Sequence, residues 1–401
     1  MTEWQTCAVP DSFVKNKVGR QNQIPTKEIA EVGRFPVVDQ GQKFVAGYCD
    51  DESKVIDFDL PLIIFGDHTR CFKYVDFPFV LGADGTKVLF PNKKLYDPRF
   101  YYFALLALEI PSRGYNRHFT ILSERSLPLP PLPEQKKIAH ILSTVQRAIE
   151  AQERIIQTTT ELKKALMHKL FTEGLRNEPQ KQTEIGPVPE SWATSTVESV
   201  CTIKASAMSY SQLEKAPNVS DGVRVIGIKV SDMNLSGNEI EFRSANLERL
   251  LPEKDARKRT VPADSIIFPK RGAAIATNKK RLTTGYTVLD PNLIAVMPSE
   301  AVNHRYLFHW FNTFDLKKIT DPGPTPQLNK KDIAPLKFPM PSVEDQVAIA
   351  AAIDAAEEKG TLHVRKRDQL QDLFRTLLHE LMTAKIRVHD SQLTPARGSR
   401  G

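Results

Sequence analysis

The longest pattern of apolar and polar positions in the chain is helical. Residues 134–173 contain no glycine or proline. Apolar side chains recur there every three or four residues, at Ile138, Ile141, Leu142, Val145, Ile149, Ile156, Leu162, Leu166 and Leu170. Pro133 suits the first position of a helix, and Gly174 suits the position just beyond its end. The pattern predicts a single helix, which at a rise of 1.5 Å per residue would be about 60 Å long.

The same pattern returns near the end of the chain. The segment from Leu127, LPLPPLPEQKKIAHIL, aligns without a gap with the segment from Phe338, FPMPSVEDQVAIAAAI, at an offset of 211 residues. Across this lead-in and helix the copies are identical at 11 of 47 positions, and Gln135 falls on Gln346. Gly360 interrupts the second copy, so we expect a break or kink there. Each helix must bury one apolar stripe, and the simplest partner is the other copy in an antiparallel pair. Two unrelated amphipathic helices on separate cores are the alternative.

Two globular blocks alternate with these helices. Short runs rich in β-branched and aromatic residues, bounded by Gly, Pro and Asp, predict strands in both blocks. The runs are FPVV (35–38), LPLIIF (60–65), KVLF (87–90), VRVIGIKV (223–230), SIIF (265–268) and YTVL (286–289). We predict an α/β protein in which two globular domains are joined by an antiparallel pair of long helices, with a pseudo-two-fold internal repeat. The expected parts are a first domain at 1–130, a central helix at 131–178, a second domain at 179–338, a C-terminal helix at 339–388 and a disordered polar tail at 389–401.

Composition excludes several classes of protein. With 401 residues, 41% apolar and 26% charged, the chain is long enough for more than one domain and too apolar to be disordered throughout. Its four cysteines are far apart and form no C-x-x-C pair, which argues against a disulfide scaffold and for a reducing cytosol. No apolar run approaches roughly 18 residues, and no basic-then-apolar leader opens the chain. We therefore expect no membrane segment, no signal peptide and a cytoplasmic location.

The positive charge is concentrated in one place. Lys and Arg total 55 against 48 Asp and Glu, which gives a net charge of +7. Between Glu253 and Arg281, nine Lys or Arg residues stand against three acids, a surplus of +6 in 29 residues. Such a block is typical of a surface that binds a polyanion, since each basic group that meets a phosphate releases counterions. A solvated basic surface is the alternative.

Several segments together resemble the specificity subunit of type I restriction-modification systems. The doubled arrangement of prolines, glutamine and long helix is the most specific part of the resemblance. It is carried by LPLPPLPEQKKIA (127–139), LMHKLFTEG (166–174) and FPMPSVEDQ (338–346). TEIGPVPESW (183–192) is similar to the start of a second target-recognition domain. FPVVDQGQKFVAGYCDD (35–51) and IIFGDHTRCFKYVDFPFVLGADGTKVL (63–89) are similar to one recurrent type of recognition domain.

The resemblance implies a subunit that is not an enzyme. Each globular domain would read one half of a split, asymmetric target in double-stranded DNA. The two helices would fix the spacing of the halves and bind two copies of a methyltransferase subunit. The resemblance implies no cofactor in this chain, S-adenosylmethionine and adenine methylation in the methyltransferase, and ATP and Mg in any motor-nuclease partner. Whether two restriction subunits also join, which bases are read and how long the spacer is stay open.

Loops of the first block carry side chains suited to reading DNA. Arg can bind guanine, and Gln adenine, through two hydrogen bonds, and other polar or basic groups meet base edges or phosphates. The candidates are Gln40, Gln42, Lys43, Asp67, His68, Thr69, Arg70, Tyr115, Asn116 and Arg117. For the four residues from Asp67 to Arg70 the alternative is a hydrogen-bonded turn.

The second block offers a more basic set. Its candidates are Lys270, Arg271, Lys279, Lys280, Arg281, Gln327 and Asn329. The lysines at 279 and 280 with Arg281 are expected to anchor phosphates, because Lys acts as a point charge. His168 and His379 occupy the same place in the two helices. We expect both to be partly buried histidines of the helix pair rather than metal ligands, since neither has a second ligand one turn away.

Other functions leave weaker traces in the sequence. Pro10-Asp11 and Glu52-Ser53-Lys54 only superficially supply the acids and lysine of a metal-dependent nuclease. A methyltransferase would need a glycine-rich turn after a strand and a Pro-Pro-aromatic loop for a flipped base, and an ATPase would need a P-loop; we find none of these. A stand-alone DNA-binding protein, or a scaffold that uses the helix pair only for assembly, is the remaining alternative. Salt-sensitive DNA binding would distinguish a DNA reader from a scaffold.

Overall fold

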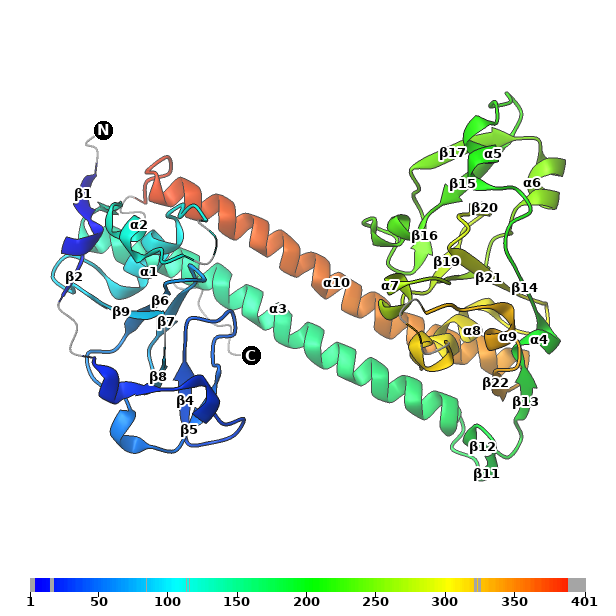
Figure 1. The fold of residues 1–401 in the computed structure, drawn as a ribbon, viewed down its shortest axis with the longest axis horizontal. Helices are drawn as coiled ribbons and strands as arrows, with labels where there is room; N and C mark the ends of the chain where they lie inside the picture. The colour runs from blue at the N-terminus through cyan, green and yellow to red at the C-terminus, as the bar shows by residue number, and fades with distance from the viewer. Residues whose placement is uncertain are drawn as a thin grey trace, which may run out of the picture. The chain divides into compact units, whose positions relative to one another are not determined.

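The chain forms two compact units (Figure 1). The computed structural model describes residues 4–14, 18–83, 85–112, 114, 116–320, 323 and 326–388, so the expected tail at 389–401 lies outside the described residues. Unit 1 comprises residues 1–154 and 364–401, and unit 2 comprises residues 155–363. The boundary falls inside both long helices, α3 (Leu132–Thr172) and α10 (Val343–Met382). Each unit therefore holds one globular block and a part of both helices.

Unit 1 is built on two four-stranded sheets, with the strand orders β2-β9-β6-β7 and β3-β8-β4-β5. The strands are β2 (Phe13–Val14), β3 (Gln23–Ile24), β4 (Phe35–Val38), β5 (Gly47–Cys49), β6 (Leu62–Gly66), β7 (Phe72–Val75), β8 (Val80–Gly82) and β9 (Thr86–Pro91). β6 is buried at every position: β7 and β9 cover its edges, and its apolar side chains alternate between two hydrophobic cores on opposite faces of the sheet. The three strand runs predicted in the first block fall on β4, β6 and β9.

An aromatic core joins the first sheet of unit 1 to its helices. In α1 (Pro98–Leu106) the side chains of Phe100 and Phe103 are fully buried, and the same core includes Leu142 of α3 and Leu381 of α10. Asp97 caps α1 by accepting two backbone N–H groups at 3.0 Å. The remaining short helices of the unit are η1 (Val9–Asp11), η2 (Arg20–Asn22), η3 (Thr26–Glu28), η4 (Glu52–Lys54) and α2 (Phe119–Ser123).

Unit 2 has a five-stranded sheet of order β14-β21-β18-β19-β16 and a three-stranded sheet of order β17-β15-β20. Their strands are β14 (Cys201–Lys204), β15 (Val223–Ile228), β16 (Glu241–Phe242), β17 (Leu247–Leu251), β18 (Ile266–Pro269), β19 (Arg281–Thr283), β20 (Tyr286–Leu289) and β21 (Leu293–Pro298). A hairpin of β11 (Gln180–Thr183) and β12 (Gly186–Pro189) precedes them. The short helices are α4 (Val197–Val200), α5 (Tyr210–Lys215), η5 (Val230–Asn234), α6 (Glu253–Arg259), α7 (Ala273–Ala276), α8 (His304–Phe311), η6 (Leu316–Ile319) and α9 (Lys330–Ile333).

Both units share one plan, as the sequence repeat predicts. In unit 1, β1 (Gln5–Ala8) pairs antiparallel with β10 (Ser126–Leu129), which leads into α3. In unit 2, β13 (Ala193–Thr196) pairs antiparallel with β22 (Lys337–Met340), which leads into α10. A capped aromatic helix packs beside each junction, α1 in unit 1 and α8 in unit 2.

A buried glutamine ties the globular block of unit 1 to its long helix. Gln135, in the first turn of α3, is fully buried. Its Oε1 accepts the backbone N–H of Asp97 at 2.8 Å. Its Nε2 donates to the backbone carbonyls of Leu95 and Pro130, each at 2.8 Å. One side chain thus joins the start of α3 to the cap of α1.

Gln346 repeats this arrangement in unit 2. It is also fully buried, and its Oε1 accepts the backbone N–H of Asn303 at 2.7 Å while its Nε2 donates to the carbonyl of Pro341 at 3.0 Å. Asn303 caps α8, as Asp97 caps α1. The glutamine shared by the two sequence copies therefore has the same structural role in both units.

Within each unit the segments of the long helices run antiparallel. In unit 2, Arg176, just beyond the end of α3, pairs with Asp345 in the first turn of α10 at 2.8 Å. In unit 1, Glu134 in the first turn of α3 pairs with Arg387, just beyond the end of α10, at 2.9 Å. The predicted antiparallel pairing is confirmed in each unit.

Two details of the predicted helices are wrong. α10 continues unbroken through Gly360. The glycine packs closely on the facing helix, where an added Cβ would lie 3.6 Å from the methyl group of Thr159. His168 and His379 are exposed rather than partly buried, because the buried stripe passes through neighbours such as Met167.

We predict that Gln135→Leu lowers the free energy of unfolding by about 3 kcal/mol, because it leaves a buried N–H and two buried carbonyls without partners. Urea unfolding followed by far-ultraviolet circular dichroism measures the change. Gln157→Leu, at an exposed position of α3, is the matched control and should change it by less than about 0.5 kcal/mol. Equal losses in both variants would contradict the role assigned to Gln135.

Candidate DNA interface

The turn after β6 is held by its own acid. Asp67 is 1% exposed, and its carboxylate accepts the backbone N–H groups of His118 and Phe119 at 2.8 and 2.7 Å. Those two groups lie at the beginning of α2, where free N–H groups favour an anion. The expectation that Asp67 contacts DNA is therefore corrected. Its carboxylate fastens the turn to α2, which is the hydrogen-bonded alternative.

The same turn is braced against the loop that follows β4. The side chain of Gln40 accepts the backbone N–H of His68 at 3.2 Å, and Thr69 Oγ1 donates to the carbonyl of Gln40. An added Cβ at Gly66 would lie 2.1 Å from Thr69 Oγ1, so only glycine permits this approach. Gln40, His68 and Thr69 are partly buried and build the surface rather than project from it.

Five predicted residues of unit 1 project outward. Gln42, Lys43, Arg70, Asn116 and Arg117 are all exposed. They come from three segments that the contacts of Gln40 and Asp67 bring together, so predictions made separately converge on one surface. Tyr115 lies outside the described residues.

Two of these segments have further supports. The carbonyl of Lys43 accepts a hydrogen bond from Lys73 Nζ, which also pairs with Asp39 at 3.4 Å. Burial lowers the pKa of Lys73, and the charge of Asp39 partly counters the shift. Arg70 donates to the carbonyl of Ile110 at 2.9 Å while staying exposed. Arg70 can therefore turn to a ligand at the loss of one surface hydrogen bond.

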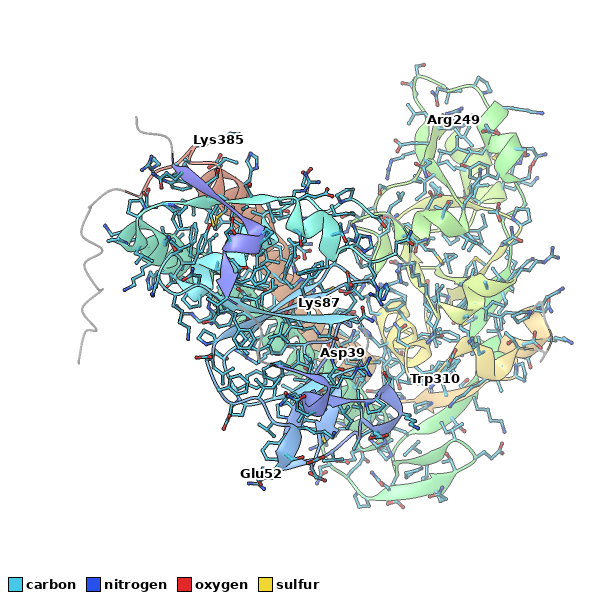
Figure 2. The ribbon with its side chains drawn as sticks, turned by 60° about the vertical axis from the view of Figure 1, so that its left-hand side comes forward. Asp39, Glu52, Lys87, Arg249, Trp310 and Lys385 are labelled. Carbon is cyan, nitrogen blue, oxygen red and sulfur yellow. The ribbon has the colours of Figure 1, made fainter. Side chains whose placement is uncertain are left out.

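Sequence reasoning missed Lys87, a basic residue beside this surface. Lys87 lies on β9 (Figure 2). Its Nζ is 5.6 Å from the ring centre of Phe119 at the start of α2. It is half-buried within a strand that is otherwise buried. The available signal was a lysine at the beginning of the predicted strand KVLF.

The loop after β18 carries the main candidates of unit 2. Arg271 forms an isolated β-bridge with Gln327, supported by hydrogen bonds from Leu328 N to the Lys270 carbonyl and from Gly272 N to the Pro326 carbonyl, both at 2.9 Å. Arg271 and Gln327 are exposed, and Lys270 is half-buried. Two loops more than 50 residues apart in the sequence thus form a single projecting surface. Asn329 is partly buried at the beginning of α9.

The expected phosphate anchors at 279–281 are largely turned inward. Lys280 is 2% exposed, and its Nζ donates to Asn278 Oδ1 at 2.8 Å and to the carbonyl of Phe314 at 3.0 Å. Arg281 donates to the carbonyls of Met233 and Lys280, and burial lowers its pKa. The expectation is corrected for Lys280, which is buried among its partners. Lys279 stays half-exposed and contacts Asn234.

A charged cluster of unit 2 lies between α8 and α10. His309, Asp354 and Glu357 place nitrogen and oxygen atoms within 4.8 Å of one another. Arg305 binds Asp354 through two hydrogen bonds, and Lys163 pairs with Glu357 at 2.5 Å. Burial opposes ionisation of Asp354, but hydrogen bonds from His309 and Arg305 outweigh it and lower its pKa to about 2. The two basic side chains neutralise the acids, so the cluster is an ion-pair network.

No helix in the described ranges combines the length and apolar character that crossing a bilayer requires. The architecture defines a class of proteins with two recognition-type domains, each built onto the ends of a shared pair of long helices. The chain belongs to the family described as the type I restriction modification DNA specificity domain, whose match covers residues 1–160 and 189–372.

Similar proteins agree with this assignment. The chain is 26% identical over 324 residues to the putative type I restriction enzyme MjaX specificity subunit of Methanocaldococcus jannaschii, covering 77% of this chain and 73% of the relative. It is 21% identical over 349 residues to the EcoR124I/EcoR124II specificity subunit of Escherichia coli, covering 82% and 81%. The crystal structure of the type I restriction-modification S subunit from M. genitalium has a TM-score of 0.61 at 16% identity, over 94% of this chain and 96% of that one. The predicted fold class and family are confirmed.

The buried position of Lys280 predicts a pH effect on stability. Burial lowers its pKa to about 8 from an ordinary 10.5. Between these values the unfolded chain binds more protons than the folded chain, so the free energy of unfolding should rise with pH across this window. Lys280→Met should abolish that part of the rise in urea unfolding series. Lys254→Met, at an exposed position of α6, should retain it; a rise that persists in Lys280→Met would refute the prediction.

Proposed function

We propose that this chain is the non-catalytic, DNA-reading subunit of a type I restriction-modification complex. Each unit binds one half of a split target in double-stranded DNA. Basic side chains anchor phosphates, and loop side chains read base edges in the major groove. The chemistry belongs to partner subunits, with S-adenosylmethionine in a methyltransferase and ATP and Mg in any motor-nuclease.

The observation that carries the proposal is that the two units have the same junction architecture but present different side chains on their exposed loops. Both units have the same strand pair, capped helix and buried glutamine at their junctions. Their exposed loops differ: unit 1 presents Gln42, Lys43 and Arg70, whereas unit 2 presents Arg271 and Gln327. Because the two units share a backbone architecture but differ in their exposed side chains, we expect them to bind two half-sites of different sequence.

The long helices support the assembly part of the proposal. Each unit exposes one side of the same two helices, so the chain offers two related surfaces to copies of one partner. We infer two methyltransferase subunits per chain, joined in a restriction complex by two restriction subunits.

The proposal is tested by co-expressing this chain with the methyltransferase encoded beside it, in a host free of DNA methylation, and mapping modified bases across the genome. A split, asymmetric motif with modified adenines in both halves is the expected result. A soluble, co-purifying complex that adds no methylation would favour a scaffold. A scaffold would also retain no duplex at any salt, whereas a DNA reader should lose affinity steeply between about 50 and 200 mM salt.

Arg271→Ala should relax or weaken recognition of one half-site only, with a loss of roughly 10- to 100-fold, as expected for a bidentate arginine–base contact. Modification of sites mutated in one half at a time measures the effect. Arg224→Ala, an exposed arginine of unit 2 paired with Glu248 at 2.8 Å, is the control and should leave both half-sites unchanged. Equal loss at both half-sites in Arg271→Ala would indicate a structural role instead.

A further inference from the structure

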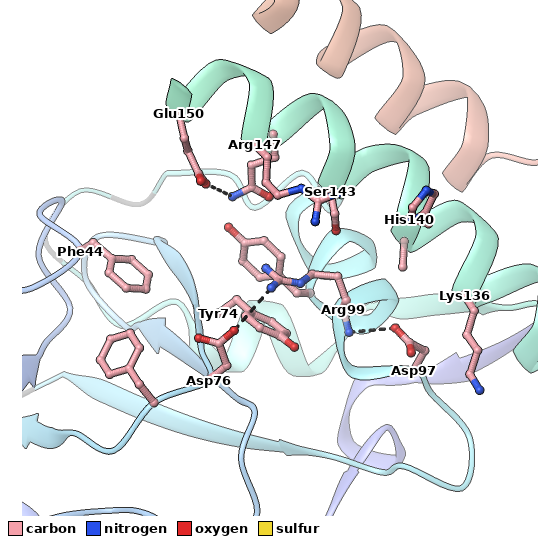
Figure 3. A pocket seen from close by; sticks show the side chains of 14 residues that line it. Phe44, Tyr74, Asp76, Asp97, Arg99, Lys136, His140, Ser143, Arg147 and Glu150 are labelled. Atoms are coloured by element: carbon pink, nitrogen blue, oxygen red, sulfur yellow. Dashed lines mark hydrogen bonds and ion pairs between the residues drawn. The ribbon is translucent and has the colours of Figure 1, made fainter. Parts of the chain in front are cut away.

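Unit 1 contains a groove along one face of α3. Its volume is about 860 Å³, and it lies between α3 and the surface formed by β7, α1 and the loop after β4 (Figure 3). The residues of α3 that line it recur every three or four positions and include Lys136, His140, Ser143, Arg147 and Glu150. This spacing places them on one side of the helix, over about 21 Å of its length.

The opposite wall of the groove is aromatic. Phe44, Phe77, Tyr74 and Tyr102 line it, and the first two rings meet edge to face at 5.9 Å. Arg99 is held against this wall: its guanidinium lies 3.5 Å from the Tyr74 ring centre and 3.6 Å from Asp76 (Figure 3). The wall therefore offers flat π surfaces and a carboxylate to whatever enters.

Two polar atoms of α3 are left without partners at this groove. Ser143 Oγ and Gln146 Oε1 are both inaccessible to solvent and make no hydrogen bond within the described part of the chain. Gln146 Nε2 is already engaged by Glu150 at 3.2 Å, so its oxygen is the unused acceptor. A buried polar atom without a partner costs about 1–3 kcal/mol, which a ligand that donates hydrogen bonds would recover.

Unit 2 places basic side chains on the same helix positions, although Glu357 Oε2 and His309 Nδ1 stay without a hydrogen-bond partner in the described part of the chain. At the repeat offset of 211 residues, Ser143 corresponds to Asp354 and Gln146 to Glu357. In unit 2 Arg305 donates two hydrogen bonds to Asp354, and Lys163 pairs with Glu357. Arg99 of α1 corresponds in position to Arg305 of α8, since each lies two residues after the capping residue of its helix. Arg99 is held by Tyr74 and Asp76 instead. Among the described residues of unit 1, no basic side chain is bonded to Ser143 Oγ or Gln146 Oε1 as Arg305 and Lys163 are bonded to the matching positions in unit 2.

We propose that the groove of unit 1 receives an arginine side chain from a partner protein. Under the proposed function, on which this inference rests, that partner is the methyltransferase subunit. An arginine fits because it offers five donors in a plane and can stack on aromatic rings. It can reach the acceptors of α3 once the side chains of Ser143 and Gln146 turn toward the groove that they line. The lining holds three acids, Asp76, Asp97 and Glu150, and three bases, Lys136, Arg99 and Arg147. This balance favours a protein side chain over a polyanion.

Two variants test the groove by charge. Ser143→Lys and Gln146→Lys place an ammonium group where the arginine enters, and each should weaken binding of the purified methyltransferase about tenfold or more in titration calorimetry. Thr144→Lys, at an exposed position one residue away, is the matched control and should bind as the unaltered chain does. Circular dichroism of each variant verifies folding. Unchanged affinity in both folded Lys variants would overturn the groove proposal.

A neutral double variant separates binding from stability. Ser143→Ala with Gln146→Met removes both unpaired acceptors and adds no charge. It should raise the unfolding temperature of the free chain and still weaken methyltransferase binding several-fold, because the arginine loses its acceptors. If binding is unchanged while stability rises, the groove does not take an arginine.

Photocross-linking identifies the group that enters. A photoreactive phenylalanine analogue in place of Phe44 should capture a methyltransferase peptide that contains arginine, and charge reversal of that arginine should abolish the cross-link. Capture of a peptide without arginine would overturn the proposal. If the unaltered chain binds no methyltransferase at all, the proposed function fails, an outcome distinct from failure of the groove alone.

Discussion

The direction in which each globular block leaves its long helix depends on a junction that water does not reach. Gln135 and Gln346 fill this junction with hydrogen bonds that have no solvent to replace them. A tilt of the block would separate buried donors from buried acceptors, which is expensive in a low-dielectric interior. A protein that reads two separated DNA segments needs a fixed angle between each block and its helix, since small tilts near the helix become large displacements at the loops.

The two units share a backbone architecture but carry different side chains at matching positions of their long helices. Unit 2 neutralises the inner face of α10 with its own Arg305 and Lys163, whereas unit 1 leaves Ser143 and Gln146 beside an open groove. The sequence repeat supplies equivalent positions, and different side chains at these positions make different contacts in the two units. The chain is therefore symmetric in its backbone plan and asymmetric in the side chains that meet other molecules.

The sequence allowed the helices, several strands and the repeat to be predicted because their signals are periodic. FPVV and YTVL coincide with β4 and β20, and Gly174 has the positive φ of +68° expected beyond a helix end. Non-local features were not accessible. Lys280 belongs to a run of basic residues that looks solvated, yet a carbonyl 34 residues away accepts a hydrogen bond from its Nζ and holds the side chain inside. Asp67 looked like a loop residue because its partners, at the beginning of α2, lie 51 and 52 residues further on.

Contacts between loops that are far apart in the sequence could not be predicted either. Thr69 Oγ1 donates to the carbonyl of Gln40, and Arg271 forms a backbone bridge with Gln327. Neither contact leaves a periodic trace in the sequence. Residue types nominated segments that turn at the surface, because glycine, glutamine and arginine are common where chains turn and meet ligands. Only the fold showed which side chains face outward and which serve as supports.

The division of the chain into units has a consequence for its synthesis. Unit 2 is one continuous stretch, residues 155–363, whereas unit 1 needs residues from both ends of the chain. As the polypeptide leaves the ribosome, the second block can complete its core while the first still waits for Leu381 and Arg387. The domain made first is thus finished last. Until then the apolar residues of unit 1 stay exposed and are available to chaperones. A chain that lacks its last residues would therefore lose the stability of the N-terminal block, which needs them, before that of unit 2.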